Sequence, residues 1–259
     1  MEVFGYLALI GIGIVLGLLG GGGSMLSIPV LVYLFSMDVV TASSYSLFIV
    51  GVTSVLGVWL KQKNQMVNIP AGLLFGGSSV IAIFIVRQWI LPNIPEVILV
   101  NALHVTKRML ILTVFAVLAM LSAIIGILKG QDTETQGGTY HKGYLLPTGF
   151  LTGLLVGFVG AGGGFLILPA LLFFGKLPFR AAVGTTLFVI VINSLMGFAG
   201  DAFSHSLDWQ FLAIVTALAM AGMLLGNLTH RVMPVRYLRL SFSLVMLTLG
   251  VWMLSHELL

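Results

Sequence analysis

The residues of this chain that could bind a ligand are glycines, hydroxyl side chains and one amide, all set within strongly apolar stretches. One glycine run, from Gly20 to Gly23, precedes Ser24, and a second run, from Gly160 to Gly164, precedes Pro169. Hydrocarbon offers a broken helix no hydrogen-bond partner, so such a run belongs inside protein or beside a watery cavity. Bare N–H groups followed by a helix start form an anion site. The sequence therefore predicts backbone anion donors at Gly22, Gly23, Ser24, Gly162, Gly163 and Gly164.

Polar side chains in two further apolar stretches could complete this site. At a shift of 140 residues, Thr53 and Ser54 of one stretch align with Asn193 and Ser194 of the other. Each hydroxyl could instead bond a carbonyl of its own helix, and the glycines could serve only close helix packing. A buried amide needs a partner, so Asn193 is expected to face either a cavity or a neighbouring helix. The predicted side-chain donors are Ser43, Ser46, Thr53, Ser54, Thr185, Thr186, Asn193 and Ser194.

The same shift of 140 residues aligns much of the two halves of the chain. The glycine runs coincide, and so do Pro29 and Pro169. This self-similarity is typical of a tandem repeat. It predicts a first repeat over residues 1–128, a polar linker over 129–143 and a second repeat over 144–259, together one integral membrane domain.

The composition is that of a protein embedded in a lipid bilayer. Hydrophobic residues make up 59% of the 259 residues and charged residues only 8%, a balance that no soluble domain of this size shows. So apolar a composition excludes a soluble nucleic-acid-binding protein, although the formal charge is +4. The absence of cysteine excludes disulfides and thiolate metal sites.

Hydropathy predicts an all-α polytopic fold with about eight net crossings, four in each repeat. Each repeat is expected to start with a glycine-broken or re-entrant helix, because residues 5–36 are too long for one straight crossing. An even number of crossings in each repeat makes the two repeats parallel. The basic residues at 107–108 and 231–239 then lie in the cytoplasm, and both termini lie outside.

The charged residues are expected at helix ends and in loops. Arg180 lies beside the second polar stretch. It could attract anions to the cytoplasmic opening of a transport path, or it could orient the chain at a lipid headgroup. For Arg87, the role at a lipid headgroup is expected. Residues 61–65 are expected to form a solvated loop, and no carboxylate lies where a proton relay would need one. The histidines lack metal-site spacing, and the glycine runs lack the Lys-Ser/Thr of a P-loop. We therefore expect neither an enzyme nor a metal or cofactor site.

The stretch Phe179-Arg180-Ala181-Ala182-Val183-Gly184-Thr185-Thr186-Leu187 and the paired Gly-then-Pro motifs resemble the sulfite exporter TauE/SafE family. The resemblance covers nearly the whole chain and is better in the second half. In the first half the corresponding residues read Ala42-Ser43-Ser44-Tyr45-Ser46-Leu47, with a serine in place of the glycine. The resemblance implies an inner-membrane permease, with sulfite, sulfonates or related sulfur compounds as substrates of some members.

Together, the residues and the resemblance predict a permease that exports a small anion, a sulfur oxyanion or organosulfonate, by alternating access. The expected location is a bacterial inner membrane. Two alternatives remain at this point: a passive, channel-like anion pore, and an accessory or assembly protein that transports nothing. Small-residue faces also permit a homodimer.

Overall fold

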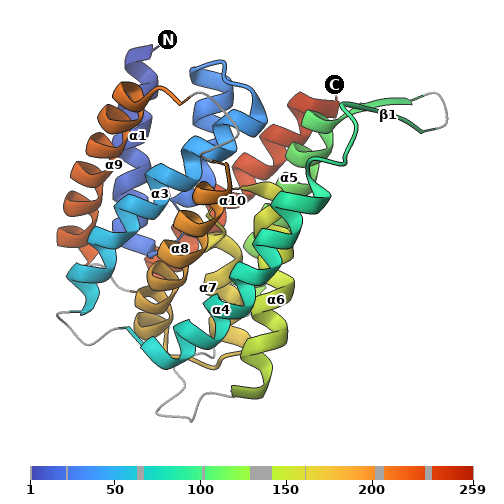
Figure 1. The fold of residues 1–259 in the computed structure, drawn as a ribbon. Coiled ribbons are helices and arrows are strands. Elements are labelled where there is room, and N and C mark those ends of the chain that lie inside the picture. Colours follow the sequence, from blue (N-terminus) through green and yellow to red (C-terminus); the bar gives the residue numbers. More distant parts are fainter. Residues whose placement is uncertain are drawn as a thin grey trace.

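A computed structural model describes residues 2–21, 23–62, 67–100, 103–128, 142–160, 162–201, 207–230 and 235–258, nearly all of them helical (Figure 1). Five of its helices are long and apolar enough to cross a membrane, by length and composition. The elements are α1 (Glu2–Leu19), α2 (Ser24–Pro29), the π-helical η1 (Val30–Leu34), α3 (Val39–Gln62), α4 (Ile69–Ile85), the π-helical η2 (Val86–Ile90), β1 (Val97–Val100), β2 (Leu103–Thr106), α5 (Lys107–Leu128), α6 (Lys142–Val159), α7 (Gly164–Phe173), α8 (Phe179–Asp201), α9 (Trp209–His230) and α10 (Val235–Leu258).

Side-chain caps fix the starts of several helices. The Asp38 carboxylate accepts a hydrogen bond from the Val40 amide at 2.9 Å at the start of α3. Asn68 accepts from the Ala71 amide at 3.1 Å, and Pro70 stands in the first turn of α4, where its missing N–H costs nothing. Asp208 accepts from the Phe211 amide at 3.0 Å and so caps the start of α9.

After each glycine break the chain turns back toward the end of the bundle from which it came. In the first half, the Tyr6 ring near the start of α1 lies edge-on to the Phe35 ring just after η1, with 5.4 Å between centroids. In the second half, Leu145 near the start of α6 approaches Gly175, which follows α7. The broken segment is therefore re-entrant in both halves, one of the two forms that the sequence allowed.

The two polar helices α3 and α8 pack against each other in the middle of the bundle and run in opposite directions (Figure 1). Gly51 faces Ser194 and Leu195, whereas Leu47, one turn earlier, faces Gly197, one turn later. These helices are equivalents under the 140-residue shift, so the predicted parallel relation of the two halves is wrong. The physical reason is that each broken segment returns to the end of the bundle where it began, and α3 and α8 then start at opposite ends.

The remaining helices pair across the two halves. Helix α1 lies along α9, and α4 lies along α6 (Figure 1). Glycines permit the close approach: a Cβ on Gly13 would lie 2.8 Å from the Met223 amide, and one on Gly153 would lie 2.7 Å from Ser79 Cα. Each half therefore completes its packing with helices of the other.

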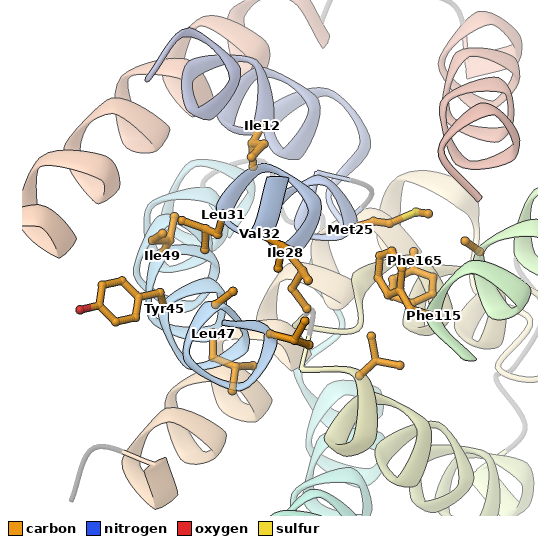
Figure 2. Packing of buried hydrophobic residues seen from close by; sticks show 14 of the residues in the cluster. Ile12, Met25, Ile28, Leu31, Val32, Tyr45, Leu47, Ile49, Phe115 and Phe165 are labelled. Atoms are coloured by element: carbon orange, nitrogen blue, oxygen red, sulfur yellow. The ribbon is translucent and has the colours of Figure 1, made fainter. Parts of the chain in front are cut away.

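The re-entrant segment α2–η1 lies in the hydrophobic core beside α1 and α3 (Figure 2). Met25 extends toward Phe165 of α7 and Phe115 of α5, whose rings meet edge-on at 5.5 Å (Figure 2). Pro169 has no N–H to bond the Phe165 carbonyl within α7, and the Ser122 hydroxyl of α5 donates to that carbonyl at 2.7 Å. A buried backbone acceptor is thus satisfied where the helix cannot satisfy it.

Two parts of the fold differ from the sequence-based expectation. The fold was expected to be all-α, but β1 and β2 pair as two antiparallel strands, with Val97 opposite Thr106. Helix α3 continues through Gln62, so Lys61 is not in a solvated loop and is only 1% exposed. Most of the predicted linker, 129–141, lies outside the described residues.

Candidate functional site

The two glycine breaks meet at the centre of the bundle. A Cβ on Gly21 would lie 2.8 Å from the carbonyl oxygen of Gly164, and one on Gly164 would lie 2.5 Å from Gly21 Cα. Gly20, Gly160, Gly162 and Gly163 all have positive φ, between 66° and 78°, which side chains rarely adopt. The close approach and the backbone conformation both require glycine here. Gly22 lies outside the described residues.

The surroundings of the two breaks correspond under the 140-residue shift. Gly20 packs against Val183 of α8, and Gly160 packs against Ser43 of α3, the residue equivalent to Val183. Gly20 and Gly160 also donate to equivalent carbonyls, those of Leu16 and Val156, each at 2.8 Å. The local backbone therefore repeats from one half to the other, while the contacting side chain changes from apolar to polar.

Several predicted site residues already have hydrogen-bond partners. Ser24 donates to the Gly21 carbonyl at 2.8 Å, and Ser43 donates to the Val40 carbonyl of its own helix at 2.9 Å. The Ser46 hydroxyl bonds the Ser27 hydroxyl of α2. Thr185 accepts from the Asn68 amide at 3.0 Å and so faces the start of α4 rather than the centre.

Other predicted site residues are fully buried with polar atoms that have no partner among the described residues. The free atoms are hydroxyls on α3 and α8 and an amide oxygen on α8. An unpartnered buried polar atom destabilises the fold by about 1–3 kcal/mol, so a group of them in one place requires a reason. The residues are Thr53, Ser54, Thr186, Asn193 and Ser194, all 0% exposed.

Among these residues, Thr186 and Ser194 of α8 lie beside the glycine breaks. A Cβ on Gly162 would lie 3.1 Å from Ser194 Oγ, and one on Gly21 would lie 2.7 Å from the Thr186 methyl carbon. Thr53 and Ser54 follow Gly51, which faces Ser194, within one helical turn. The two glycine breaks and the free hydroxyls of α8 are thus neighbours. Thr113, Thr216 and Ser243 also carry free hydroxyls, on α5, α9 and α10.

Asn193 bridges α8 and α4. Its amide Nδ2 donates to the Ser79 hydroxyl at 2.8 Å, and its Oδ1 has no partner. Because a hydroxyl both donates and accepts, the amide can turn over and direct N–H groups inward instead. Asn193 is therefore both an inter-helix contact and a source of a free polar atom.

A charged cluster that the sequence did not predict lies at the end of the bundle where α8 ends. Arg87 of η2 forms an ion pair with Asp201, the last residue of α8, and the two side chains are 3% and 17% exposed. Its Nη2 donates to Ser43 Oγ at 3.1 Å, while the Ser44 hydroxyl donates to Asp201 at 2.6 Å. The expectation that Arg87 sits at a lipid headgroup is wrong, because its guanidinium points into the protein.

Arg180 lies at the other end of α8, in its first turn, and its side chain is exposed. A positive charge thus stands near each end of this central helix, one buried and one open. The sequence signal for Arg87 was available in principle: Arg87 and Asp201 are opposite charges at the ends of apolar helices. Their contact requires that η2 and the end of α8 lie at the same end of the bundle.

Comparison with known proteins finds relatives over nearly the whole chain. The family model described as sulfite exporter TauE/SafE matches residues 6–253. A probable membrane transporter protein of Bacillus subtilis, YdhB, is 29% identical over 224 residues, covering 86% of this chain and 88% of its own. The probable membrane transporter protein MJ0441 of Methanocaldococcus jannaschii is 25% identical over 264 residues, covering 95% and 94%. No solved structure matches. The chain therefore belongs to the sulfite exporter TauE/SafE family.

Proposed function

We propose that this protein is a permease that moves a small anion, a sulfur oxyanion or an organosulfonate, across the cytoplasmic membrane by alternating access. The family description names a sulfite exporter, and the curated relatives are named probable membrane transporter proteins. Export, and location in a bacterial inner membrane, are parts of the proposal that rest on the family. The residues of this chain support the anion and its site.

The observation that carries the proposal is the set of unpartnered polar atoms on Thr53, Ser54, Thr186, Asn193 and Ser194. A protein whose helices only pack would satisfy these groups or replace them with apolar residues. Hydroxyl donors, and the amide N–H groups of Asn193 once the amide turns over, can replace the hydration shell of a small oxyanion when it leaves water. They stand beside two broken helices, the arrangement that many secondary transporters use to bind substrate at the midplane.

The relation between the halves supports alternating access. We infer two inverted repeats, because α3 and α8 are antiparallel equivalents and each half begins with a re-entrant glycine-broken segment. The non-glycine residues with positive φ, Ser36 and Lys176, are also equivalent under the 140-residue shift. Two inverted copies can exchange conformations, and this exchange moves access from one side to the other around a fixed site.

The conformation described here is closed at the centre. The five residues with free polar atoms are all 0% exposed, so an anion reaches them only after neighbouring helices move. A passive pore would instead need a continuous open path in its conducting state. The closed centre is the occluded form that alternating access requires.

Purified protein in lipid vesicles tests the proposal. Labelled sulfite, sulfate, thiosulfate, sulfoacetate and chloride are supplied in parallel, and the initial rate of movement is measured against concentration. The proposal predicts saturable movement of at least one sulfur anion, with chloride slower. Linear, unsaturated movement of every anion would indicate a pore, and no movement at all would indicate an accessory protein.

A further inference from the structure

The Arg87–Asp201 cluster is built like an occupied oxyanion site. The Asp201 carboxylate accepts hydrogen bonds from the Arg87 guanidinium and from the Ser44 hydroxyl, the latter at 2.6 Å. Guanidinium and hydroxyl donors recognise sulfonate and sulfite oxygens as readily as they recognise a carboxylate. The carboxylate of Asp201 thus stands where an oxyanion from solution would bind.

Arg87 also lies directly on the second glycine break. A Cβ on Gly160 would come within 2.6 Å of Arg87 Nη2 and 2.5 Å of Ser43 Cβ, and Gly160 has φ of 78°, so this position favours glycine. In the first half, the corresponding glycine, Gly20, meets the apolar Val183. The charge is therefore a specific addition to one break and is not demanded by the fold of the break itself.

Two further features concern the donors of Arg87 that are not yet used and the space beside it. Its Nε–H is buried and has no hydrogen-bond partner among the described residues. Arg87 and Asp201 also line a cavity of about 380 Å³, together with Asp38, Glu96 and Lys107. An anion in this cavity would lie beside the ion pair, and the Arg87 side chain reaches from the cavity wall to Gly160.

Because the Arg87 guanidinium is buried, its stability depends on a neighbouring negative charge. A buried guanidinium without a counter-ion is strongly destabilising, so an empty site needs an internal anion and an occupied site does not. Asp201 is the more exposed partner and is the last residue of its helix, so its side chain can turn toward the cavity when another anion arrives.

We propose that Arg87 binds the transported anion at this mouth and that the Asp201 carboxylate takes the anion's place when the site is empty. Substrate entry then exchanges one anion for another on the same guanidinium, and the buried positive charge stays neutralised throughout. The inference rests on the proposed function and adds to it a binding residue, Arg87, and an internal competitor, Asp201.

The test compares the concentration of sulfur anion that gives half-maximal flux in wild type, Asp201→Asn and Arg87→Gln. Loss of the competitor should lower the half-saturating concentration in Asp201→Asn by on the order of tenfold, the scale of one charge-assisted hydrogen bond. Arg87→Gln should raise it by a similar factor. Asp208→Asn is the matched control: it changes the same charge at the start of α9, keeps a capping side chain and should leave half-saturation unchanged.

A second measurement does not depend on flux. Sulfate is added to purified protein, and the thermal midpoint is recorded for wild type, Asp201→Asn and the double variant Arg87→Gln/Asp201→Asn. The single variant has an uncompensated guanidinium and should gain more from sulfate than wild type, whereas the double variant should gain nothing.

The outcomes separate the two proposals. If the wild type moves anions but Asp201→Asn and Arg87→Gln keep its half-saturation and its sulfate response, the pair is only a structural link between α4 and α8, and the inference is overturned. A double variant that transports with wild-type half-saturation would overturn it equally. If the wild type moves none of the five anions, the proposed function itself fails, and the role of Arg87 fails with it.

Discussion

The backbones of Gly21 and Gly164 touch at the centre of the bundle, although they belong to different halves of the chain. This contact joins the two broken segments and brings Thr186 and Ser194 of α8 against them. A substrate held there would touch both halves at once. A movement of one half would therefore displace the other half through this contact.

We predict that Gly164→Ala disrupts this contact. Its Cβ would lie 2.5 Å from Gly21 Cα, so the backbones must separate, at a cost of about 1–3 kcal/mol. The thermal midpoint of the purified protein should fall and transport should be lost. Gly77→Ala is the control, because a Cβ there meets nothing within 4 Å on an exposed face of α4, and alanine favours the helix by roughly 1 kcal/mol. Equal midpoints for the two variants would contradict the contact.

The free hydroxyl of Ser194 should contribute to transport without contributing to stability. Ser194→Ala removes a buried hydroxyl that has no partner, so the free energy of unfolding should stay the same or rise by up to about 1–3 kcal/mol. The thermal midpoint should therefore be unchanged or higher, while transport falls. Ser122→Ala is the opposite case, because its hydroxyl bonds the carbonyl that Pro169 leaves free, and its loss should lower the midpoint. Unchanged transport in Ser194→Ala with normal expression would remove this hydroxyl from the site.

A comparison with Ser79 distinguishes a substrate-binding role of Asn193 from its role as a bridge between helices. Asn193→Leu removes the bridge and the free amide atom, and Ser79→Ala removes the bridge alone. We expect flux to fall well below wild type in Asn193→Leu, with folding retained, and to fall less in Ser79→Ala. The same loss of flux in both variants would assign Asn193 to packing between α4 and α8.

Much of the fold follows from local chemistry that the sequence displays. The starts of α2 at Ser24 and α7 at Gly164 follow from the glycine runs, and the caps at Asp38 and Asp208 follow from residue type. These features depend on neighbouring residues alone. Local signals therefore sufficed to place the helices, the breaks and the polar stretches.

The direction of the second half could not be predicted in this way. A shift that aligns two repeats has the same form whether they are parallel or inverted. The difference lies in whether the broken segment crosses or returns, and that depends on contacts such as Tyr6 with Phe35. The pairing of Arg87 with Asp201 was missed for the same reason, because it exists only when the ends of α4 and α8 lie at one end of the bundle.

The exposed Arg180 should act through long-range attraction rather than through binding. Arg180→Gln should slow transport at low ionic strength, and the difference from wild type should shrink as salt rises and the Debye length falls to about 8–10 Å. Initial rates at two salt concentrations measure this. A deficit that persists at high salt would place Arg180 in direct contact with the substrate, and no deficit at low salt would leave it an orienting charge.

The central claim is that a small sulfur anion crosses the membrane through the site between the two glycine breaks. Its most direct test is the flux of labelled sulfite, sulfate, thiosulfate, sulfoacetate and chloride in vesicles with wild type and Gly163→Val. Gly163 has φ of 72° and packs against Val156, so valine there should deform the start of α7. The account predicts saturable movement of one sulfur anion that is lost in the folded variant. Movement of none of these anions by the wild type, or full movement by the variant, would contradict it.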